Sequence, residues 1–300
     1  MDLASTVSIV TSTFPSSLSP SRANDFQNCP LKFRLRNIDR IPEEPSAAAL
    51  RGNLVHSALE GLFDLPAHER NVRAATALLE QAWLAMAESN PAGVSALLVD
   101  AQLPNDPAQA ESFAAHMVSR IEPLLETYFS LEDPTRLNPH AREMAVNVSI
   151  TEGFGIRGFI DRVDIAPAGQ VRIVDYKTGK APRAGFESSA MFQMRFYALA
   201  WWRMTGDIPA MLQLLYLGSK EVLKYEPAEH DLLVTERKIL SIRAQIQQAV
   251  LEGFEPKPSK LCGWCSYQHL CPKYGGTIPE LPHSDSWEST TFETVRTEEA

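Results

Sequence analysis

Two carboxylates and a lysine stand in two consecutive segments of alternating apolar residues. Gly158-Phe-Ile-Asp161 places one carboxylate within an apolar strand pattern, and Asp175-Tyr-Lys177 ends the next such pattern. On a strand, the side chains of Asp175 and Lys177 would share a face, because they are two residues apart. Two carboxylates beside an ammonium group suit a hard divalent cation and a group that holds or polarises water. His56, on a predicted helix, would add an imidazole. Taken singly, the Asp175–Lys177 segment is explained equally well by an ion pair, and a lone histidine on a helix is more often structural than a ligand. The combined order of these residues favours a metal site.

The four cysteines of the chain form a second candidate site. Cys262, Cys265 and Cys271 make a Cys-x2-Cys-x5-Cys cluster, and Cys29 lies near the other end of the chain. Short-spaced thiols in a chain without a recognisable secretory signal favour metal binding over disulfides. Four thiolates suit zinc or an iron–sulfur cluster, and the spacing alone leaves both open. With Cys29 as the fourth ligand, such a centre would join the two ends of the chain like a clasp.

The elements that must position these residues follow the order helix, three strands, helix, strand. Hydrophobic periodicity and turn residues predict helices at about 18–26 and 46–63, strands at 142–150, 156–165 and 171–177, a helix at 188–204, a strand at 211–217 and a helix at 232–251. The short turns between the first three strands predict antiparallel pairing. Gln193 and Tyr197 lie four residues apart on the helix at 188–204 and share one face, although such pairs are usually part of a core.

Acidic residues are concentrated in two parts of the chain. The whole chain of 300 residues has a net charge of −9, but the segment 66–133 carries −7 and the tail 275–300 carries −5, so the remainder is positive. Segregated charge of this kind does not exclude a nucleic-acid partner. The segment 66–135 shows two helical patterns, at about 69–89 and 107–130, and no motif, so we interpret it as an insertion. We expect a flexible segment at 1–18, one domain at 19–274 and a disordered acidic tail at 275–300.

Several classes of protein are excluded or disfavoured by the composition. The chain contains no run of 18 apolar residues, the length that would be needed to cross a membrane. Its N-terminal segment has neither a basic start nor an apolar stretch. We therefore expect a cytoplasmic protein. The phosphate-binding pattern Gly-x4-Gly-Lys-[Ser/Thr] does not occur, which excludes a helicase motor of the common type within this chain.

In their order and spacing, these motifs resemble the RecB-like branch of the PD-(D/E)xK nuclease superfamily, which includes the Cas4-like nucleases of CRISPR adaptation. The resemblance covers about 19–63 and 142–272. It rests on Pro20-Ser-Arg, Phe26, Cys29-Pro30, Arg51-Gly52, His56, Gly158-Phe-Ile-Asp161, Asp175-Tyr-Lys177, Gln193, Tyr197 and the Cys262–Cys271 cluster. The proline of the superfamily name is replaced by Ile160, as is usual in this branch. The resemblance implies an α/β fold, namely a restriction-endonuclease-like αβββαβ core.

The same resemblance implies roles for individual residues. His56, Asp161, Asp175 and the Tyr176 carbonyl would bind Mg²⁺ or Mn²⁺, and Lys177 would orient or activate the attacking water. Glu143 is a further candidate acid on the first core strand. Gln193 and Tyr197 would lie beside the active site and the DNA, and the four cysteines would hold a structural [4Fe–4S] cluster. Basic residues near the motifs are candidates for DNA contacts: Lys32, Arg34, Arg36, Arg51, Lys180 and Arg183.

We therefore expect a metal-dependent DNA exonuclease of repair or recombination, acting on DNA ends or single strands, with a helicase or repair protein as a candidate partner. Two alternatives remain at this point. One is a Cas4-like nuclease of CRISPR adaptation, although the helical insertion makes this chain longer than that minimal type. The other is an iron–sulfur or zinc protein that binds nucleic acid without cleaving it.

Overall fold

A computed structural model describes residues 15–102, 110–183 and 188–282. The contacts within the chain divide these residues into two compact units. The terminal unit contains the described residues up to 43, the segment 147–157 and the residues from 238 onward. The central unit contains 44–146 and 158–237, apart from the undescribed gaps. Parts of two long strands, β2 (Ala141–Thr151) and β3 (Phe154–Ile165), belong to each unit.

The central unit is built on a mixed sheet. Strand β3, which also pairs with β2, runs antiparallel to β4 (Val171–Lys177). β4 runs parallel to β5 (Met211–Tyr216), which pairs antiparallel with β6 (Glu221–Tyr225). The β4–β5 pair is parallel because α7 (Ser188–Thr205) connects the two strands as a crossover helix. This mixed sheet with helices confirms the expected α/β class and the restriction-endonuclease-like arrangement.

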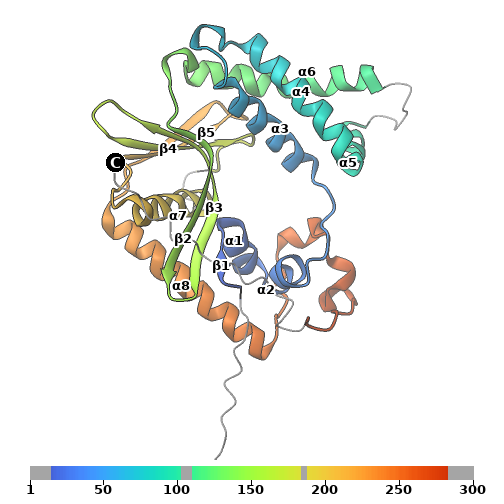
Figure 1. Cartoon of the computed structure of the whole chain (residues 1–300). Coiled ribbons are helices and arrows are strands. Elements are labelled where there is room, and N and C mark those ends of the chain that lie inside the picture. Colours follow the sequence, from blue (N-terminus) through green and yellow to red (C-terminus); the bar gives the residue numbers. More distant parts are fainter. Residues whose placement is uncertain (1–14, 103–109, 184–187, 283–300) are drawn as a thin grey trace, which may run out of the picture. The chain divides into compact units, whose positions relative to one another are not determined.

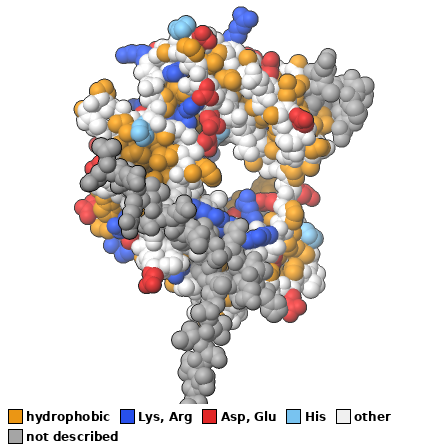
Figure 2. All heavy atoms as spheres, in the orientation of Figure 1, with side chains coloured by type: hydrophobic (Ala, Val, Ile, Leu, Met, Phe, Trp, Pro, Cys, Tyr) orange, Lys and Arg blue, Asp and Glu red, His pale blue; other side chains and the backbone are white. Residues whose placement is uncertain are grey.

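A block of four helices covers one face of the central sheet (Figure 1). It consists of α3 (Ala47–Leu62), α4 (Val72–Ser89), α5 (Pro91–Ala101) and α6 (Ala110–Leu131). Apolar side chains of these helices form one buried core with Val174 and Tyr176 of β4 and with Leu215 of β5. The insertion predicted at 66–135 therefore shares its core with α3 and the sheet. Acidic side chains gather next to α3 on the face shown in Figure 2.

Two elements of the central unit differ from the sequence-based expectation. Residues 90–107 were predicted to separate two helices, but Pro91–Ala101 is itself a helix. Its start is well capped, because the Asn90 side chain accepts a hydrogen bond from the Gly93 N–H at 2.9 Å and Pro91 occupies the first helical position. Strand β6 was not predicted, because its short, mostly exposed sequence Glu-Val-Leu-Lys-Tyr gives little hydrophobic signal.

The terminal unit combines both ends of the described chain. Ser17 and Leu18, expected within the flexible N-terminal segment, form the buried strand β1, which pairs in parallel with Gly155 and Ile156 of β3. Helices α1 (Pro20–Asn28) and α2 (Pro30–Phe33) follow, and α8 (Glu229–Glu252) enters this unit from the central one. The cysteine segment contains three short 3-10 helices, Lys260–Trp264, Gln268–Leu270 and Pro272–Tyr274.

Residues 1–14 and 283–300 lie outside the described residues. They contain most of the predicted flexible start and most of the predicted acidic tail. The predicted single domain at 19–274 also stays a prediction. Among the described helices, none is both long and apolar enough to span a membrane.

Candidate metal-dependent active site

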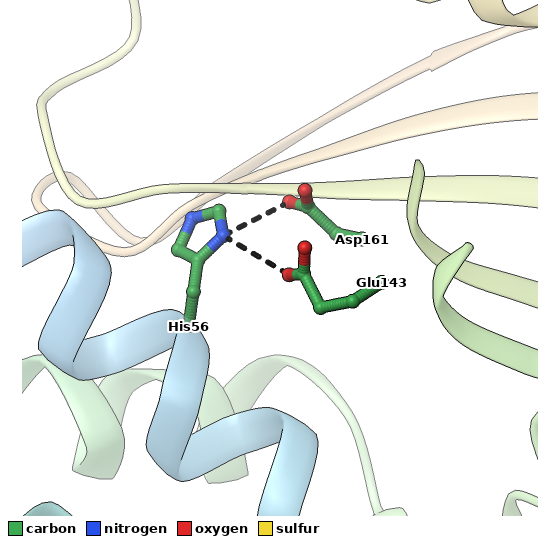
Figure 3. Close-up of side chains that lie close together, drawn as sticks. All are labelled: His56, Glu143 and Asp161. Atoms are coloured by element: carbon green, nitrogen blue, oxygen red, sulfur yellow. Dashed lines mark ion pairs between the residues drawn. The ribbon is translucent and has the colours of Figure 1, made fainter. Parts of the chain in front are cut away.

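An imidazole and two carboxylates meet at one edge of the central unit (Figure 3). His56 comes from α3, and its Nδ1 lies 3.4 Å from Oδ2 of Asp161 on β3 and 3.9 Å from Oε1 of Glu143 on β2. One potential ligand atom from each residue lies within 4.8 Å of the others. Imidazole nitrogen and carboxylate oxygen together suit Mn²⁺ well, and carboxylate oxygens suit Mg²⁺. The three residues therefore fit the divalent metal that the sequence led us to expect.

The backbone of β2 is unusual at the acidic member of this group. Glu143 has φ of +42°, a conformation that residues other than glycine rarely adopt. Non-glycine residues in this region often occur at functional sites, where the surrounding structure holds them in place. With this backbone conformation, the Glu143 side chain lies near His56. The regular alternation of side chains along a strand does not predict that contact. Glu143 was only a candidate acid in the sequence, and the structure places it with His56 and Asp161.

Tyr176 joins the two predicted ligands through its main chain. Its N–H donates a hydrogen bond to Oδ2 of Asp161 at 2.8 Å, and its carbonyl oxygen lies 2.9 Å from Nε2 of His56. The Tyr176 ring also packs edge-on against the imidazole, with 5.8 Å between the ring centroids. The Tyr176 carbonyl, a predicted metal ligand, therefore lies at the site, where it contacts the imidazole.

Charge crowding changes the pKa values of two of these groups. Burial, and next the negative charge of Asp175, raise the pKa of Asp161 to about 7. Burial of His56 opposes its protonation, but the nearby carboxylates of Glu143, Asp161 and Asp175 raise the pKa of His56 to about 9. The carboxylates contribute to both shifts, because negative charge opposes ionisation of Asp161 and favours protonation of His56. A bound divalent cation would neutralise that charge.

Asp175 and Lys177 lie next to this group, on β4. Lys177 Nζ is 2.7 Å from Oδ2 of Asp175, whose carboxylate is almost fully buried. Gln193 of α7 contacts both, because its Nε2 donates to Asp175 Oδ1 and its Oε1 accepts from Lys177 Nζ, each at 2.9 Å. Gln193 therefore fixes the positions of the carboxylate and the ammonium group. Asp175 is near enough to shift the pKa values of His56 and Asp161, yet it lies outside the compact three-residue group.

Tyr197 lies under the strand that carries Asp161. Its side chain is 7% exposed, and burial raises the pKa of its hydroxyl to about 12. Gly158 is required at this point, because a Cβ there would lie 2.8 Å from Cε1 of the Tyr197 ring. The expected Gln193 and Tyr197 pair thus contacts β4 through Asp175 and Lys177, and β3 through Gly158.

Behind the site lies a buried ionic network that the sequence analysis did not single out. Arg162, next to Asp161, is 0% exposed. It donates two hydrogen bonds to Glu132, at 2.8 and 3.1 Å, and one to the Tyr176 hydroxyl at 2.7 Å. Its Nε also pairs with Asp164 at 3.1 Å. A buried arginine cannot be recognised from periodicity, since arginine is normally exposed.

The basic residues proposed for DNA contacts differ in their surroundings. Arg51 forms an ion pair with Asp100 of α5, while Lys180 and Arg183 are exposed. In the terminal unit, three more candidates form ion pairs. Lys32 and Arg36 each pair with Asp25 and Glu43, and Arg34 pairs with Asp39. Their contacts with DNA stay predictions.

The four cysteines are all unpaired and line a single cavity of about 100 Å³ in the terminal unit. Backbone N–H groups point at two of the sulfurs, since Lys257 N donates to Cys29 Sγ at 3.4 Å and Ser259 N donates to Cys262 Sγ at 3.3 Å. The Ser259 hydrogen bond lowers the pKa of the Cys262 thiol. Within the described chain, no three of the cysteine sulfurs lie as close together as 4.8 Å.

Comparison with known proteins assigns this chain to a family. Residues 17–272 match the family described as "PD-(D/E)XK nuclease superfamily". "Gene 69 protein" of Mycobacterium phage L5 is 27% identical over 295 residues, which covers 85% of this chain and 96% of the phage protein. A solved structure titled "Putative exonuclease" from Eubacterium rectale is 14% identical, with a TM-score of 0.47, and covers 89% of this chain and 93% of its own. Because this family match spans most of the chain, the chain belongs to the PD-(D/E)XK nuclease superfamily.

Proposed function

We propose that the protein is a deoxyribonuclease that hydrolyses phosphodiester bonds with Mg²⁺ or Mn²⁺, and that it acts as an exonuclease in DNA repair or recombination. The observation that supports this most directly is the arrangement of His56, Glu143 and Asp161 beside a buried pair of Asp175 and Lys177. A structural ion pair alone would not require a second carboxylate and an imidazole at the same edge. Membership of a nuclease superfamily is consistent with the hydrolytic class.

Each residue then has a defined task. His56, Glu143 and Asp161 would hold the metal, with Asp175 and the Tyr176 carbonyl as neighbouring donors. When bound, the metal lowers the pKa of water and withdraws charge from the phosphate. The Lys177 ammonium, fixed by Gln193 and Asp175, supplies a positive contact to the phosphate and orients the attacking water. Tyr176 keeps Asp161 and His56 in register through its main chain.

The test is cleavage of end-labelled single- and double-stranded DNA with Mg²⁺, Mn²⁺ or EDTA. We expect metal-dependent cleavage by the wild type and a loss on the order of 10²-fold or more for Lys177→Ala. Lys224→Ala, on the exposed strand β6, serves as the matched control and should cleave normally. Equal cleavage by Lys177→Ala and wild type would disprove the mechanism. DNA binding without cleavage by a folded, metal-binding wild type would favour the non-catalytic alternative, and the product ladder would give the polarity.

We further propose that Cys29, Cys262, Cys265 and Cys271 bind a [4Fe–4S] cluster with a structural role. The shared cavity and the N–H···S hydrogen bonds support a thiolate-bound centre. Four thiolates suit zinc or an iron–sulfur cluster, so the metal content of the purified protein decides between the two. Anaerobically purified protein should be brown and contain iron, whereas colourless protein with one zinc per chain would overturn the assignment.

A further inference from the structure

We propose that Phe159 stacks on an unpaired nucleobase beside the phosphate that is cleaved, and thereby directs the active site toward single-stranded DNA. The proposal rests on the nuclease function proposed above and names the substrate class of the same site. Phe159 is 60% exposed, although it lies within the β3 segment that carries Asp161. A single exposed apolar side chain is common on protein surfaces and needs no explanation by itself. The position of this one distinguishes it.

Phe159 shares a face of β3 with the candidate metal ligand Asp161. Side chains along a strand alternate between faces, and the intervening Ile160 and the following Arg162 are both fully buried. The exposed phenyl ring and the Asp161 carboxylate therefore leave the strand on the same side. Two residues along a strand span about 6–7 Å. A phosphate held at the site would place its sugar and base within reach of the ring.

The backbone that presents Phe159 is held firmly. The Tyr197 ring packs so closely on Gly158, the residue before Phe159, that a Cβ there would lie 2.8 Å from Cε1 of the ring. Tyr197 is itself buried on α7, the helix that also supplies Gln193 to the site. An aromatic ring on a fixed backbone can stack with a small loss of conformational entropy, because only the side-chain torsions become ordered.

The chemistry of an exposed phenyl ring selects the occupant. Every nucleobase has a π-face, so stacking on an aromatic side chain tolerates any sequence and contributes about 1–3 kcal/mol per base. Bases inside a duplex are paired and already stacked on both sides, so a side chain reaches them only after they are unstacked at a cost of a few kcal/mol. The contact therefore favours a single strand over an intact duplex. The phosphates of the same strand would meet Lys177 and the metal group.

The experiment compares Phe159→Ala with wild type on oligonucleotides that carry one abasic residue at successive positions. On intact single-stranded DNA, we expect kcat/KM to fall about 5- to 150-fold in the variant. On the substrate that lacks the base next to the cleaved phosphate, the kcat/KM of the wild type should already be reduced by this factor. On that substrate, Phe159→Ala should have nearly the same kcat/KM as the wild type. Phe159→Leu keeps the apolar volume without a π-face and should behave like Phe159→Ala. Ile165→Ala, on an exposed residue of the same strand, is the matched control and should cleave normally.

Binding without cleavage separates this proposal from the nuclease proposal. Anisotropy of labelled single-stranded DNA in EDTA should show the same 5- to 150-fold weakening for Phe159→Ala, and the thermal shift caused by Mn²⁺ should remain as in wild type. If the wild type binds but does not cleave DNA, the nuclease proposal fails while the binding comparison still decides the role of Phe159. Equal binding and cleavage by Phe159→Ala and wild type would overturn the inference. An equal loss on blunt duplex DNA would overturn the preference for single strands.

Discussion

Replacing Arg162 should be the most destabilising single change among the charged residues of the central unit. Arg162 is 0% exposed, and Glu132, its main partner, has a side chain only 8% exposed. Although burial opposes its charge, the Tyr176 hydroxyl and the carboxylates of Glu132 and Asp164 raise the pKa of Arg162, so it remains a cation. Arg162→Met would fill much of the same space and remove every donor. Glu132 would then retain Arg172 at 3.5 Å and Gln213 at 3.1 Å.

The expected cost follows from the burial of the partner that remains. Removing one member of a buried ion pair costs about 3–5 kcal/mol when the other charge is left unpaired, and the lower end, about 3 kcal/mol, is expected here because Glu132 keeps Arg172 and Gln213. Total stabilities of protein domains are about 5–15 kcal/mol, so this is a large share. Glu132→Gln keeps a hydrogen-bonding side chain and leaves Arg162 paired with Asp164, so about 1–3 kcal/mol is expected. The more exposed pair of Arg203 and Glu236 provides a control, since Arg203→Met should cost about 0–1 kcal/mol.

The assay is urea unfolding of the metal-free protein, monitored by circular dichroism, with thermal melts as a second measurement. With an entropy of unfolding of about 2.1 cal/mol/K per residue, a loss of about 3 kcal/mol should lower the melting temperature by about 5 °C in a chain of 300 residues. The slope of the urea transition must stay constant for the comparison to report stability. The reasoning is refuted if Arg162→Met costs no more than Arg203→Met, because the network would then contribute no more than a surface pair.

Three further changes test other parts of the structure. Since burial and Asp175 raise the pKa of Asp161 to about 7, the ionised carboxylate costs stability above pH 7, and this cost fades as the pH falls toward 4. Asp161→Asn should therefore stabilise the metal-free protein by roughly 1–3 kcal/mol at pH 8 and by less at pH 5. The same variant should lose the thermal shift that Mn²⁺ gives to the wild type. A larger stabilisation at pH 5 than at pH 8 would contradict the raised pKa of Asp161. Asp100→Asn releases Arg51 and should strengthen DNA binding and steepen its salt dependence by about one unit, unlike the control Glu236→Gln. Cys29→Ser should remove most of the bound iron, whereas Ser266→Ala should retain it; full iron content in Cys29→Ser would exclude Cys29 as a ligand.

The elements that carry the site could be predicted because their patterns are regular. The strand at Val171–Lys177 was predicted with the bounds it has, and the helix at Ser188–Thr205 to within one residue. Short apolar runs bounded by turn residues mark the buried strands, and their length separates them from the longer helix between them. The order of these elements, together with His56, Asp161 and Asp175, also led to the correct superfamily.

What could not be predicted depends on contacts between distant residues or on exposed positions. The meeting of Glu143 with His56 requires a positive φ within a strand, and no local pattern announces that conformation. The burial of Arg162 depends on Glu132, which is 30 residues away in the chain. Phe159 reads in the sequence as one more apolar residue of a strand, and only its 60% exposure separates it from its neighbours. Composition and spacing describe elements well, but not the faces that they leave uncovered.

The helical insertion contacts the candidate metal site through Tyr176. Tyr128 of α6 packs edge-on against the Tyr176 ring, with 5.8 Å between centroids, and the adjoining Glu132 holds Arg162, which donates to the Tyr176 hydroxyl. The main chain of Tyr176 in turn contacts both Asp161 and His56. The negative charge of the insertion is thus partly explained from within the fold, because Glu132 neutralises a buried arginine and Asp100 pairs with Arg51. Acids that are paired in this way do not repel DNA as free surface carboxylates would, so an acidic chain and a nucleic-acid substrate are compatible.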